Sequence, residues 1–485
     1  MSADKNAANS QFKDSRVLFK TSGDAAGEGG ILKLTRFAVV FENCNPAVVL
    51  RLSEALGSFK IVVSGREVYV GKGTVKNVLP TGAAAVSCEV TLDETCWRDV
   101  SLAAANGHFA EQLGDEYKNF LGEWEKLCRL SPEYKLALAD MQLYFTELRL
   151  WLDQLEAGLR SVPAELWPGI EAKTLKELAE VVIPTVNELF DHFEVVAHNV
   201  PEELQGAHQQ FMRRQLHSLV LAAPFAWRTY HKPLGYAGDY EMVNMILRDA
   251  PEGKTLFGKI LHLWFVRQGP AIAHRNRINY LIKKITEETV RRASDRKDCS
   301  VMNLACGPAS EVVRYVGECH IADRTAFTLL DFNDETLQHT QATVMRAAAG
   351  NDFTKYTQLV RCIRKNIPEL IKESLRPGES VAEGKYDLIY CAGLFDYLSD
   401  QVCASILETM YRWLAPGGLL VATNVEPSNP MRQGMGHLLD WHLVYRTGAQ
   451  LKALSPAAAT EENIRVIADE TGVNVFLEVR KPGYD

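Results

Sequence analysis

The chain lacks the features that mark several specialised classes of protein. Its ten cysteines are scattered over 485 residues without a CxxC pair, which argues against a disulfide scaffold and against a zinc site. Residues 1–6 are polar and are not a signal peptide, and no apolar run reaches the roughly 20 residues that span a bilayer. We therefore expect a cytoplasmic protein with reduced thiols, no metal centre and no integral membrane segment.

An excess of basic residues is also missing. The formal net charge is −8, whereas a surface that follows nucleic-acid phosphates favours a basic balance. Nucleic acid is therefore not expected as the main partner. The hydrophobic fraction of 47% and the charged fraction of 24% are ordinary for a globular protein, and the length predicts two or three domains rather than one core.

A third absence is the complete GxGxxG pattern of dinucleotide-binding proteins. An apolar run over 301–305 ends in a tight turn at Gly307 and a helix-like segment follows, but Ala305 and Ala309 replace the outer glycines. A second apolar run ends in Asp331, where an acid can accept hydrogen bonds from ribose hydroxyls. The missing glycines disfavour a nicotinamide dinucleotide. They fit S-adenosylmethionine better, because that ligand has no pyrophosphate to seat on the helix N-terminus.

Two regions of different periodicity precede this turn. Residues 1–14 are small and polar and are expected to be a disordered tail. Residues 15–104 contain short runs rich in β-branched and aromatic residues with turn signals between them, which predicts a small β-barrel. The strands expected in this barrel are 16–20, 37–41, 59–63, 67–70 and 85–90.

Residues 105–290 are predicted to be an α-helical region that caps the site or holds substrate. Apolar residues fall at helical spacing most clearly in 127–159 and 175–195. The prolines expected to separate its helices are Pro163, Pro168, Pro184 and Pro201.

Residues 291–485 alternate strand and helix patterns, which predicts an α/β, Rossmann-like, doubly wound domain with a mainly parallel sheet. Only one strand is expected after residue 424, so the sheet edge is expected to lack a final hairpin. The expected strands are 300–305, 326–330, 358–362, 386–391, 418–423 and 474–479, and the expected helices include 309–316, 335–348 and 401–414.

Four motifs of this region resemble those of class I S-adenosylmethionine-dependent methyltransferases. They are the Asn-Leu-Ala-Cys-Gly-Pro turn at 303–308, the acid Asp331, the strand 386–391 and the Ala-Pro-Gly-Gly turn with its strand at 414–421. The resemblance implies S-adenosylmethionine as cofactor, with Asn333 and Asp334 as alternatives to the acid. The residues that it implies for cofactor binding are Ala305, Cys306, Gly307, Asp331, Phe332, Ala392 and Gly393.

A basic helix start lies shortly before this domain. Methyltransferases often place a basic residue here to bind the methionine carboxylate, and a planar guanidinium suits that bidentate contact. Arg275 and Arg277 cannot point the same way on a helix, and we expect Arg277 to take this role. The alternative is a solvated basic helix end.

A loop inside the helical region carries an unusual density of hydrogen-bonding side chains. The run His-Lys-Pro-Leu-Gly-Tyr-Ala-Gly-Asp-Tyr-Glu at 231–241 is broken by glycines and a proline, and loops of this content often carry function. We expect His231, Tyr236 and Asp239 to act in catalysis. The alternative is a helix–helix connection whose tyrosines pack on the core.

A further cluster follows the fifth strand of the α/β region. Here His437, Asp440 and His442 could line an acceptor pocket, and His442 is a further catalytic candidate. Core packing is favoured for the residues at helical spacing in this segment, which are Leu438, Trp441 and Tyr445.

The 231–241 loop, the helix start at 275–277 and the 429–446 segment together resemble one subgroup, the bacterial extracellular-factor 3-hydroxypalmitate methyl ester synthase type. The resemblance implies esterification of a fatty or hydroxy-acid carboxylate, which makes a diffusible quorum-sensing signal, so a lipid-like small molecule is the expected acceptor. An ionised carboxylate needs no general base. A hydroxyl or amine acceptor would need one, for which His231, Asp239 and His442 are candidates.

The N-terminal region resembles a degenerate PilZ domain, a family that binds cyclic di-GMP. Residues 16–20 match its RxxxR motif with lysine for the second arginine, and residues 33–38 match (D/N)xSxxG with all three fixed positions changed. Lysine cannot reproduce the arginine fork that grips guanine and phosphate. We expect a barrel without nucleotide binding that serves as an interaction or homodimerisation module. The alternative is a regulatory cyclic di-GMP or protein-binding module on a methyltransferase-like domain that lacks turnover.

Overall fold

A computed structural model of the chain divides into two compact units. Unit 1 comprises Met1–Ala237, Asp249–Val266 and Pro430–His442, and unit 2 comprises Gly238–Arg248, Arg267–Asn429 and Leu443–Asp485. The predicted tail 1–14 and the predicted boundary near 104 lie outside the described residues. The residues that the structure describes are 15–45, 48–63, 65–80, 85–98, 122, 129–159, 162–348, 358–367, 369–370 and 384–483.

The predicted β-barrel is confirmed as a closed antiparallel barrel in unit 1, with strand order β1-β2-β3-β6-β5-β4. Strand β2 was not predicted because glycines hide its pattern. A Cβ atom on Gly27 would lie 2.4 Å from the Phe19 ring, so glycine leaves room for the aromatic core. The strands are β1 (Arg16–Lys20), β2 (Ala26–Leu34), β3 (Ala38–Asn43), β4 (Ala55–Val63), β5 (Arg66–Pro80) and β6 (Val86–Leu92).

Helices form the rest of unit 1, as the periodicity predicts. Pro163 and Pro201 lie in connections, but Pro184 lies inside a long helix, so the predicted break at that residue is wrong. Its ring is exposed while Val182 and Val186 beside it are buried, so packing of that face holds the helix across the missing N–H. The helices are α3 (Pro132–Leu159), α4 (Trp167–His198), α5 (Gln205–Val220), α6 (Pro224–His231), α8 (Leu256–Val266) and α15 (Arg432–Leu439).

Unit 2 has the predicted Rossmann-like α/β fold, built on a seven-stranded sheet of order β12-β13-β11-β10-β7-β8-β9. Neighbouring strands from β9 to β11 are parallel, and β13 is antiparallel to both β11 and β12. The strands are β7 (Cys299–Leu304), β8 (Thr325–Asp331), β9 (Val360–Arg364), β10 (Tyr386–Cys391), β11 (Leu414–Val425), β12 (Ile464–Ala468) and β13 (Asn474–Arg480).

The expectation that the sheet lacks a final hairpin is wrong, because β12 and β13 form one. Strand β12 is short and only half-buried at the sheet edge, which leaves a weak apolar pattern in the sequence. Asp469 fixes the turn by accepting hydrogen bonds from the backbone N–H groups of Thr471 and Asn474, and Gly472 supplies the positive φ of 72°.

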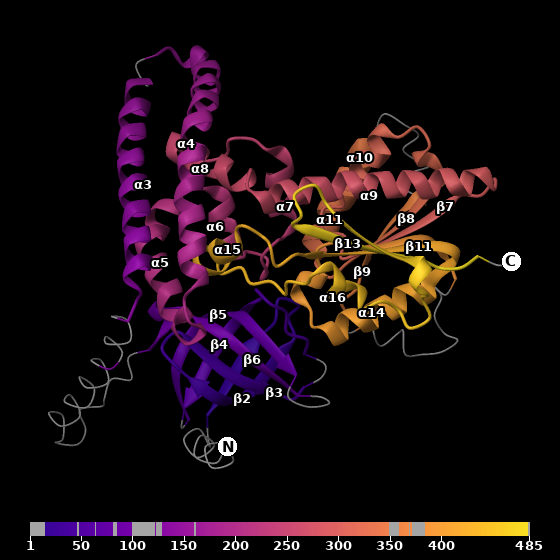
Figure 1. Cartoon of the computed structure of the whole chain (residues 1–485), viewed down its shortest axis with the longest axis horizontal. Coiled ribbons are helices and arrows are strands. Elements are labelled where there is room, and N and C mark those ends of the chain that lie inside the picture. The colour runs from indigo at the N-terminus through magenta and orange to yellow at the C-terminus, as the bar shows by residue number, and fades with distance from the viewer. Residues whose placement is uncertain are drawn as a thin grey trace. The chain divides into compact units, whose positions relative to one another are not determined.

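Helices cover both faces of the sheet, as Figure 1 shows. One face packs against α9 (Gly269–Ser294), α10 (Ser310–Glu318) and α11 (Asp334–Ala347), and the other packs against α14 (Asp400–Trp413) and α16 (Gly448–Lys452). The strand order reverses between β7 and β10. In open α/β sheets, ligands bind outside the carboxyl ends of the strands at such a reversal, so the residues after β7 and β10 are the first to consider.

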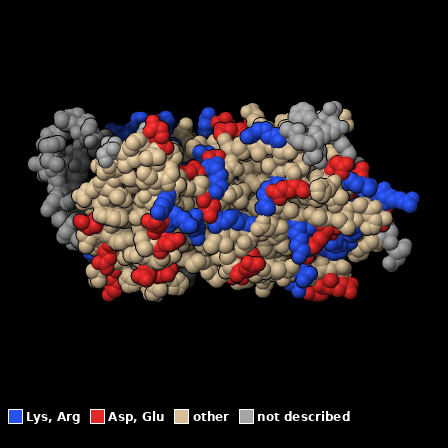
Figure 2. Space-filling model, turned by 90° about the horizontal axis from the view of Figure 1, so that it is seen from above, with Lys and Arg blue, Asp and Glu red and all other residues tan. Residues whose placement is uncertain are grey.

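The chain passes repeatedly between the two units. Helix α7 (Tyr240–Arg248) packs within unit 2, where Asn244 lies 3.2 Å from His339 of α11 and the Ile246 carbonyl accepts a hydrogen bond from Arg275. In the other direction, α15 follows strand β11 of unit 2 in sequence but packs on α4 and α5 of unit 1. Among the described residues, no helix combines the length and the apolar character needed to cross a membrane. Basic and acidic side chains are mixed on the face that Figure 2 shows.

Candidate functional site

The turn after β7 holds its backbone in an unusual conformation. Ala305, Gly307 and Ala309 all have positive φ, at 58°, 52° and 46°. The left-handed conformation costs an alanine roughly 1–2 kcal/mol, whereas glycine adopts it freely. A Cβ atom added to Gly307 would meet no atom within 4 Å, so the space beside this turn is open. The two alanines therefore keep the glycine-type turn at a cost in strain, and strain of this kind clusters at ligand sites.

Asp331 lies beside this turn at the end of β8. Its Oδ2 accepts a hydrogen bond from the Gly307 N–H at 3.1 Å, and its Oδ1 accepts one from the Asn333 N–H at 3.0 Å. A carboxylate offers about four acceptor positions, so it can bind several donors at once.

The alternatives to Asp331 are engaged elsewhere. The Asn333 side chain caps α11, and Asp334 is exposed and pairs with Arg364 at 3.2 Å. Phe332 is half-buried, and its carbonyl accepts a hydrogen bond from Arg364. Cys306 is buried, and burial raises the pKa of its thiol, so it presents a neutral side chain at this point.

Arg277 and Gly393, which the sequence places 116 residues apart, meet after β10. Arg277 lies on α9 with 8% of its surface exposed, and its Nη2 contacts the His274 ring at 3.0 Å. A Cβ atom on Gly393 would lie 2.8 Å from Arg277 Nη1, so only glycine leaves room for the guanidinium. The buried Nε of Arg277 has no hydrogen-bond partner among the described residues. A buried guanidinium with an unpaired N–H is suited to receive an anionic ligand.

Two buried carboxylates that sequence reasoning missed accompany this guanidinium. Burial lowers the pKa of Arg277, and the charges of Asp396 and Glu311 oppose that effect. Burial also raises the pKa of Asp396 to about 6, although its Oδ1 accepts the Val425 N–H at 2.7 Å. Glu311 accepts hydrogen bonds from Tyr390 and Asn303, and burial raises its pKa as well. The sequence signal for Glu311 was a charged residue directly before the apolar pair Val312 and Val313 in the predicted helix 309–316.

The loop after β10 is fixed by a second buried arginine. Arg446 donates hydrogen bonds to the carbonyls of Phe395 and Leu398 at 2.8 Å and 2.6 Å and to Asn424 at 2.8 Å. Ala392 is half-buried against the core beside this loop. The groups after β7 and β10 are therefore held on rigid elements, as a binding site requires.

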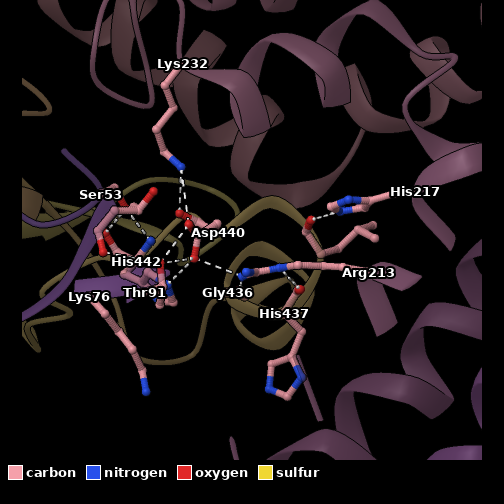
Figure 3. Close-up of polar contacts among 12 residues, drawn as sticks. Ser53, Lys76, Thr91, Arg213, His217, Lys232, Gly436, His437, Asp440 and His442 are labelled. Carbon is pink, nitrogen blue, oxygen red and sulfur yellow. Dashed lines mark hydrogen bonds and ion pairs between the residues drawn. The ribbon is translucent and has the colours of Figure 1, made fainter. Parts of the chain in front are cut away.

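A second polar constellation lies within unit 1, where Lys232 and the 437–442 segment come together (Figure 3). Asp440 is buried, and its Oδ1 lies 2.8 Å from Arg213 Nη2. Lys232 donates a hydrogen bond to the Asp440 carbonyl at 3.0 Å and lies 3.8 Å from its Oδ2. Thr91 of the barrel also donates a hydrogen bond to this carboxylate. Lys232 is a central member of this cluster that sequence reasoning did not select.

The four residues predicted to be catalytic are divided between the units. Asp239 lies in unit 2, where it caps α7 by accepting the Met242 N–H at 2.9 Å. His231 is exposed and stacks on Trp227, and Tyr236 pairs through its backbone with Glu54 of the barrel. These three roles stay predictions.

His442 is the predicted catalytic residue that meets a carboxylate in unit 1. Its Nε2 lies 3.0 Å from Asp440 Oδ1, and Ser53 of the barrel bonds both its backbone N–H and its carbonyl. Burial lowers its pKa, so the ring tends to the neutral form in which it could act as a base. Helix α15 ends at Leu439 and Asp440 turns left-handed, so Leu438, Trp441 and Tyr445 do not share one helix; Leu438 is buried and the two aromatic residues are half-buried. His437 is buried against Tyr134 and does not line a surface.

Helix α15 is capped by charged side chains at both ends. Glu194 of α4 accepts the N–H groups of Gln433 and Gly434 at 2.8 Å and 2.6 Å. At the other end, Arg213 donates to the Gly436 and His437 carbonyls, at 3.1 Å and 3.0 Å. A carboxyl group at the N-terminus and a cation at the C-terminus satisfy backbone groups that the helix itself leaves unpaired, so these side chains hold the segment in unit 1.

The Glu194 cap is expected to make stability depend on pH. Burial raises the pKa of Glu194 to about 7, opposed by the two N–H groups. Its stabilising contribution is therefore fully present below its unfolded pKa of about 4.5 and is lost as the pH rises through 7. Glu194→Gln should flatten the fall in unfolding free energy between pH 5 and 8, which amounts to up to about 3 kcal/mol. Urea denaturation at several pH values measures this slope. Glu188→Gln, on the exposed face of α4, is the control and should leave the slope as it is. An unchanged slope in Glu194→Gln would contradict the prediction.

No protein-family model and no curated protein matches this sequence. Solved structures do align with it. A Bordetella parapertussis protein described as a "possible exported protein" has a TM-score of 0.41 and 17% identity over 64% of this chain and 97% of its own. Magnesium protoporphyrin IX methyltransferase from Synechocystis PCC 6803 with bound SAH aligns with a TM-score of 0.33 and 9% identity. The alignment covers 49% of this chain and 93% of that protein. The S-adenosylmethionine-dependent methyltransferase SibL aligns with a TM-score of 0.32 and 14% identity. The alignment covers 66% of this chain and 100% of that protein. Each TM-score lies below 0.5, so none of these likenesses indicates the function of this chain.

Proposed function

We propose that the chain is a methyltransferase that uses S-adenosylmethionine to methylate a small-molecule acceptor, an O-methylation of a fatty or hydroxy-acid carboxylate that yields a methyl ester. The observation that carries the cofactor is Arg277, a buried guanidinium with an unpaired Nε beside Gly393 at the strand-order reversal. The methionine part of the cofactor brings a carboxylate that such a fork would bind. The acceptor class rests on the resemblance of the 231–241, 275–277 and 429–446 segments to methyl ester synthases.

Unit 2 offers a residue for each part of this ligand. Arg277 would bind the methionine carboxylate, and Asp331 would accept the ribose hydroxyls. Gly307 would let the cofactor approach the backbone, where the Cβ position is open. Ala392 and Gly393 would line the reacting end without adding bulk. When bound, S-adenosylmethionine supplies a methyl group on a positively charged sulfur.

The residues then have to orient the acceptor and exclude water. S-adenosylmethionine would supply the methyl group, and the acceptor carboxylate would take it up as a methyl ester, with S-adenosylhomocysteine as the other product. A carboxylate is ionised at neutral pH, so no side chain has to remove a proton. Catalysis would therefore come from proximity, alignment and desolvation rather than from a general base.

The cofactor proposal is tested by calorimetric titration of S-adenosylmethionine. Asp331→Ala removes the ribose acceptor, and we expect binding to weaken roughly 10- to 100-fold, the usual effect of losing hydrogen bonds to a charged group. Asp334→Ala is the matched control, because that carboxylate is exposed and pairs with Arg364. No binding to the unaltered chain would refute the proposal. Tight binding of cyclic di-GMP together with no methyl transfer to hydroxy fatty acids would support the regulatory alternative instead.

A further inference from the structure

Helix α3 of unit 1 carries apolar residues on two opposite sides. The side that packs in the unit is formed by Tyr134, Ala137, Leu138, Met141, Phe145, Leu148 and Leu152, all buried. On the other side, Leu136, Leu143 and Leu150 are 62%, 63% and 52% exposed. With 3.6 residues per turn, Leu143 points roughly 160° away from Phe145. A helix that is apolar on both sides is usually buried on both, but within the part of the chain that the structure describes this second side stays exposed.

The three leucines, defined here as the leucine stripe, repeat every seven residues. A seven-residue repeat drifts only about 20° per repeat around a straight helix, so it keeps one seam directed at a neighbouring helix. Ala139 and Thr146, three residues after the first two leucines, are small enough for a close approach. Asp153, at the next such position, ends the stripe. The spacing therefore indicates a helical partner rather than a flat or irregular surface.

The charges beside the stripe favour one partner and one direction. In a parallel pairing of two α3 helices, a residue just before one leucine faces the residue five positions later in the second copy. Lys135 then faces Asp140 of that copy, an attractive pair that forms twice by symmetry. The other facing pairs, Gln142 with Glu147 and Arg149 with Gln154, contain no like charges. In an antiparallel pairing centred on Leu143, Lys135 would instead lie near Arg149 and Asp140 near Glu147, and both pairs repel.

We propose that two copies of this chain associate through their α3 helices, in parallel and in register, along the leucine stripe. Because the Lys135–Asp140 pair forms twice between identical helices, a second copy offers both an apolar seam and matching charges. A two-fold axis parallel to the helices relates the copies, and each leucine meets its own counterpart. This contact lies on the helical part of unit 1, whereas the sequence had suggested the barrel.

Cysteine cross-linking of the full-length chain tests both the contact and its direction. The variants Leu136→Cys, Leu143→Cys and Leu150→Cys are oxidised separately and compared with the unaltered chain, which contributes the background of its native thiols. Parallel pairing brings each cysteine to its counterpart within the roughly 7 Å between Cα atoms that a disulfide allows, so all three should form covalent dimers. Glu177→Cys on α4, where the side chain is 70% exposed, is the control and should not. Cross-linking of Leu143→Cys alone indicates antiparallel pairing and overturns the proposal.

Light scattering provides an independent measurement. The unaltered chain should have the mass of two chains at micromolar concentration, and Leu143→Lys should have the mass of one, with the same circular dichroism spectrum and the same affinity for S-adenosylmethionine. Because Leu143 is exposed, this substitution leaves the core intact. An unaltered chain that is monomeric at tens of micromolar overturns the proposal, and so does a Leu143→Lys variant that stays dimeric.

Discussion

Replacing Arg277 with methionine is expected to weaken binding of S-adenosylmethionine by roughly 100-fold or more, about 3 kcal/mol. The reason is that the guanidinium is a buried cation at the strand-order reversal whose Nε has no partner among the described residues, and truncating one partner of a buried charged contact costs about 2–5 kcal/mol. Methionine keeps the length and apolar stem of the side chain, so the packing of α9 changes little. Titration calorimetry measures the affinity, and a chemical denaturation curve checks that the variant folds.

Two matched variants separate this prediction from a general disturbance of α9. Arg275→Met alters the same helix two residues away, where the guanidinium donates to the Ile246 carbonyl of α7 at 2.9 Å, so it should leave the affinity within about twofold. Arg277→Lys keeps the charge but loses the fork and should fall between the two. Unchanged binding by Arg277→Met, or equal losses at both arginines, would remove this residue from the cofactor site.

The residues around Arg277 differ in how well they could be predicted from the sequence. The motif spacing placed Gly307 and Asp331 at the ends of neighbouring strands, because a parallel strand–turn–helix unit brings those positions to one edge. The same spacing could not reveal Asp396 and Glu311, whose burial beside Arg277 depends on how α9, α10 and the loop after β10 converge.

Two strands escaped prediction for local reasons. Strand β2 is rich in glycine because the Phe19 and Phe41 rings occupy the space that side chains would fill, so its apolar alternation is lost. Strand β12 lies at a sheet edge and is half-buried, so its pattern is weak. The prediction at Pro184 was wrong for the opposite reason. The proline is a strong local signal for a helix break, but tertiary packing keeps α4 continuous through it.

The polar cluster of unit 1 lay beyond sequence reasoning for a different reason. Lys232 and Asp440 are 208 positions apart, and each has an ordinary local role as a left-handed helix cap. Lysine and aspartate are usually exposed, so neither suggested a buried pair. Only the return of α15 into unit 1 brings them together.

Removing the Asp440 carboxylate is expected to destabilise unit 1 strongly. Asp440→Ala leaves Arg213 and Lys232 buried without their counter-charge, and breaking a buried pair in this way costs about 3–5 kcal/mol. Thermal and urea unfolding measure the loss. The control is Asp153→Ala, whose carboxylate is 49% exposed and pairs with Arg149 at 3.8 Å, so its effect should stay within about 0.5 kcal/mol.

The pH dependence of this loss identifies its cause. Burial lowers the pKa of Lys232 to about 8, although Asp440 raises it, so without the carboxylate that pKa falls further. Because the folded pKa then lies well below the unfolded value of about 10.5, the folded variant binds fewer protons and gains stability as the pH rises. The deficit of Asp440→Ala should therefore shrink between pH 6 and 9. Lys232→Met in the Asp440→Ala background should recover part of the stability at pH 6 and little at pH 9, since neutral lysine no longer needs a partner. A deficit that is constant with pH would mean that lost packing, and not an uncompensated charge, destabilises the variant.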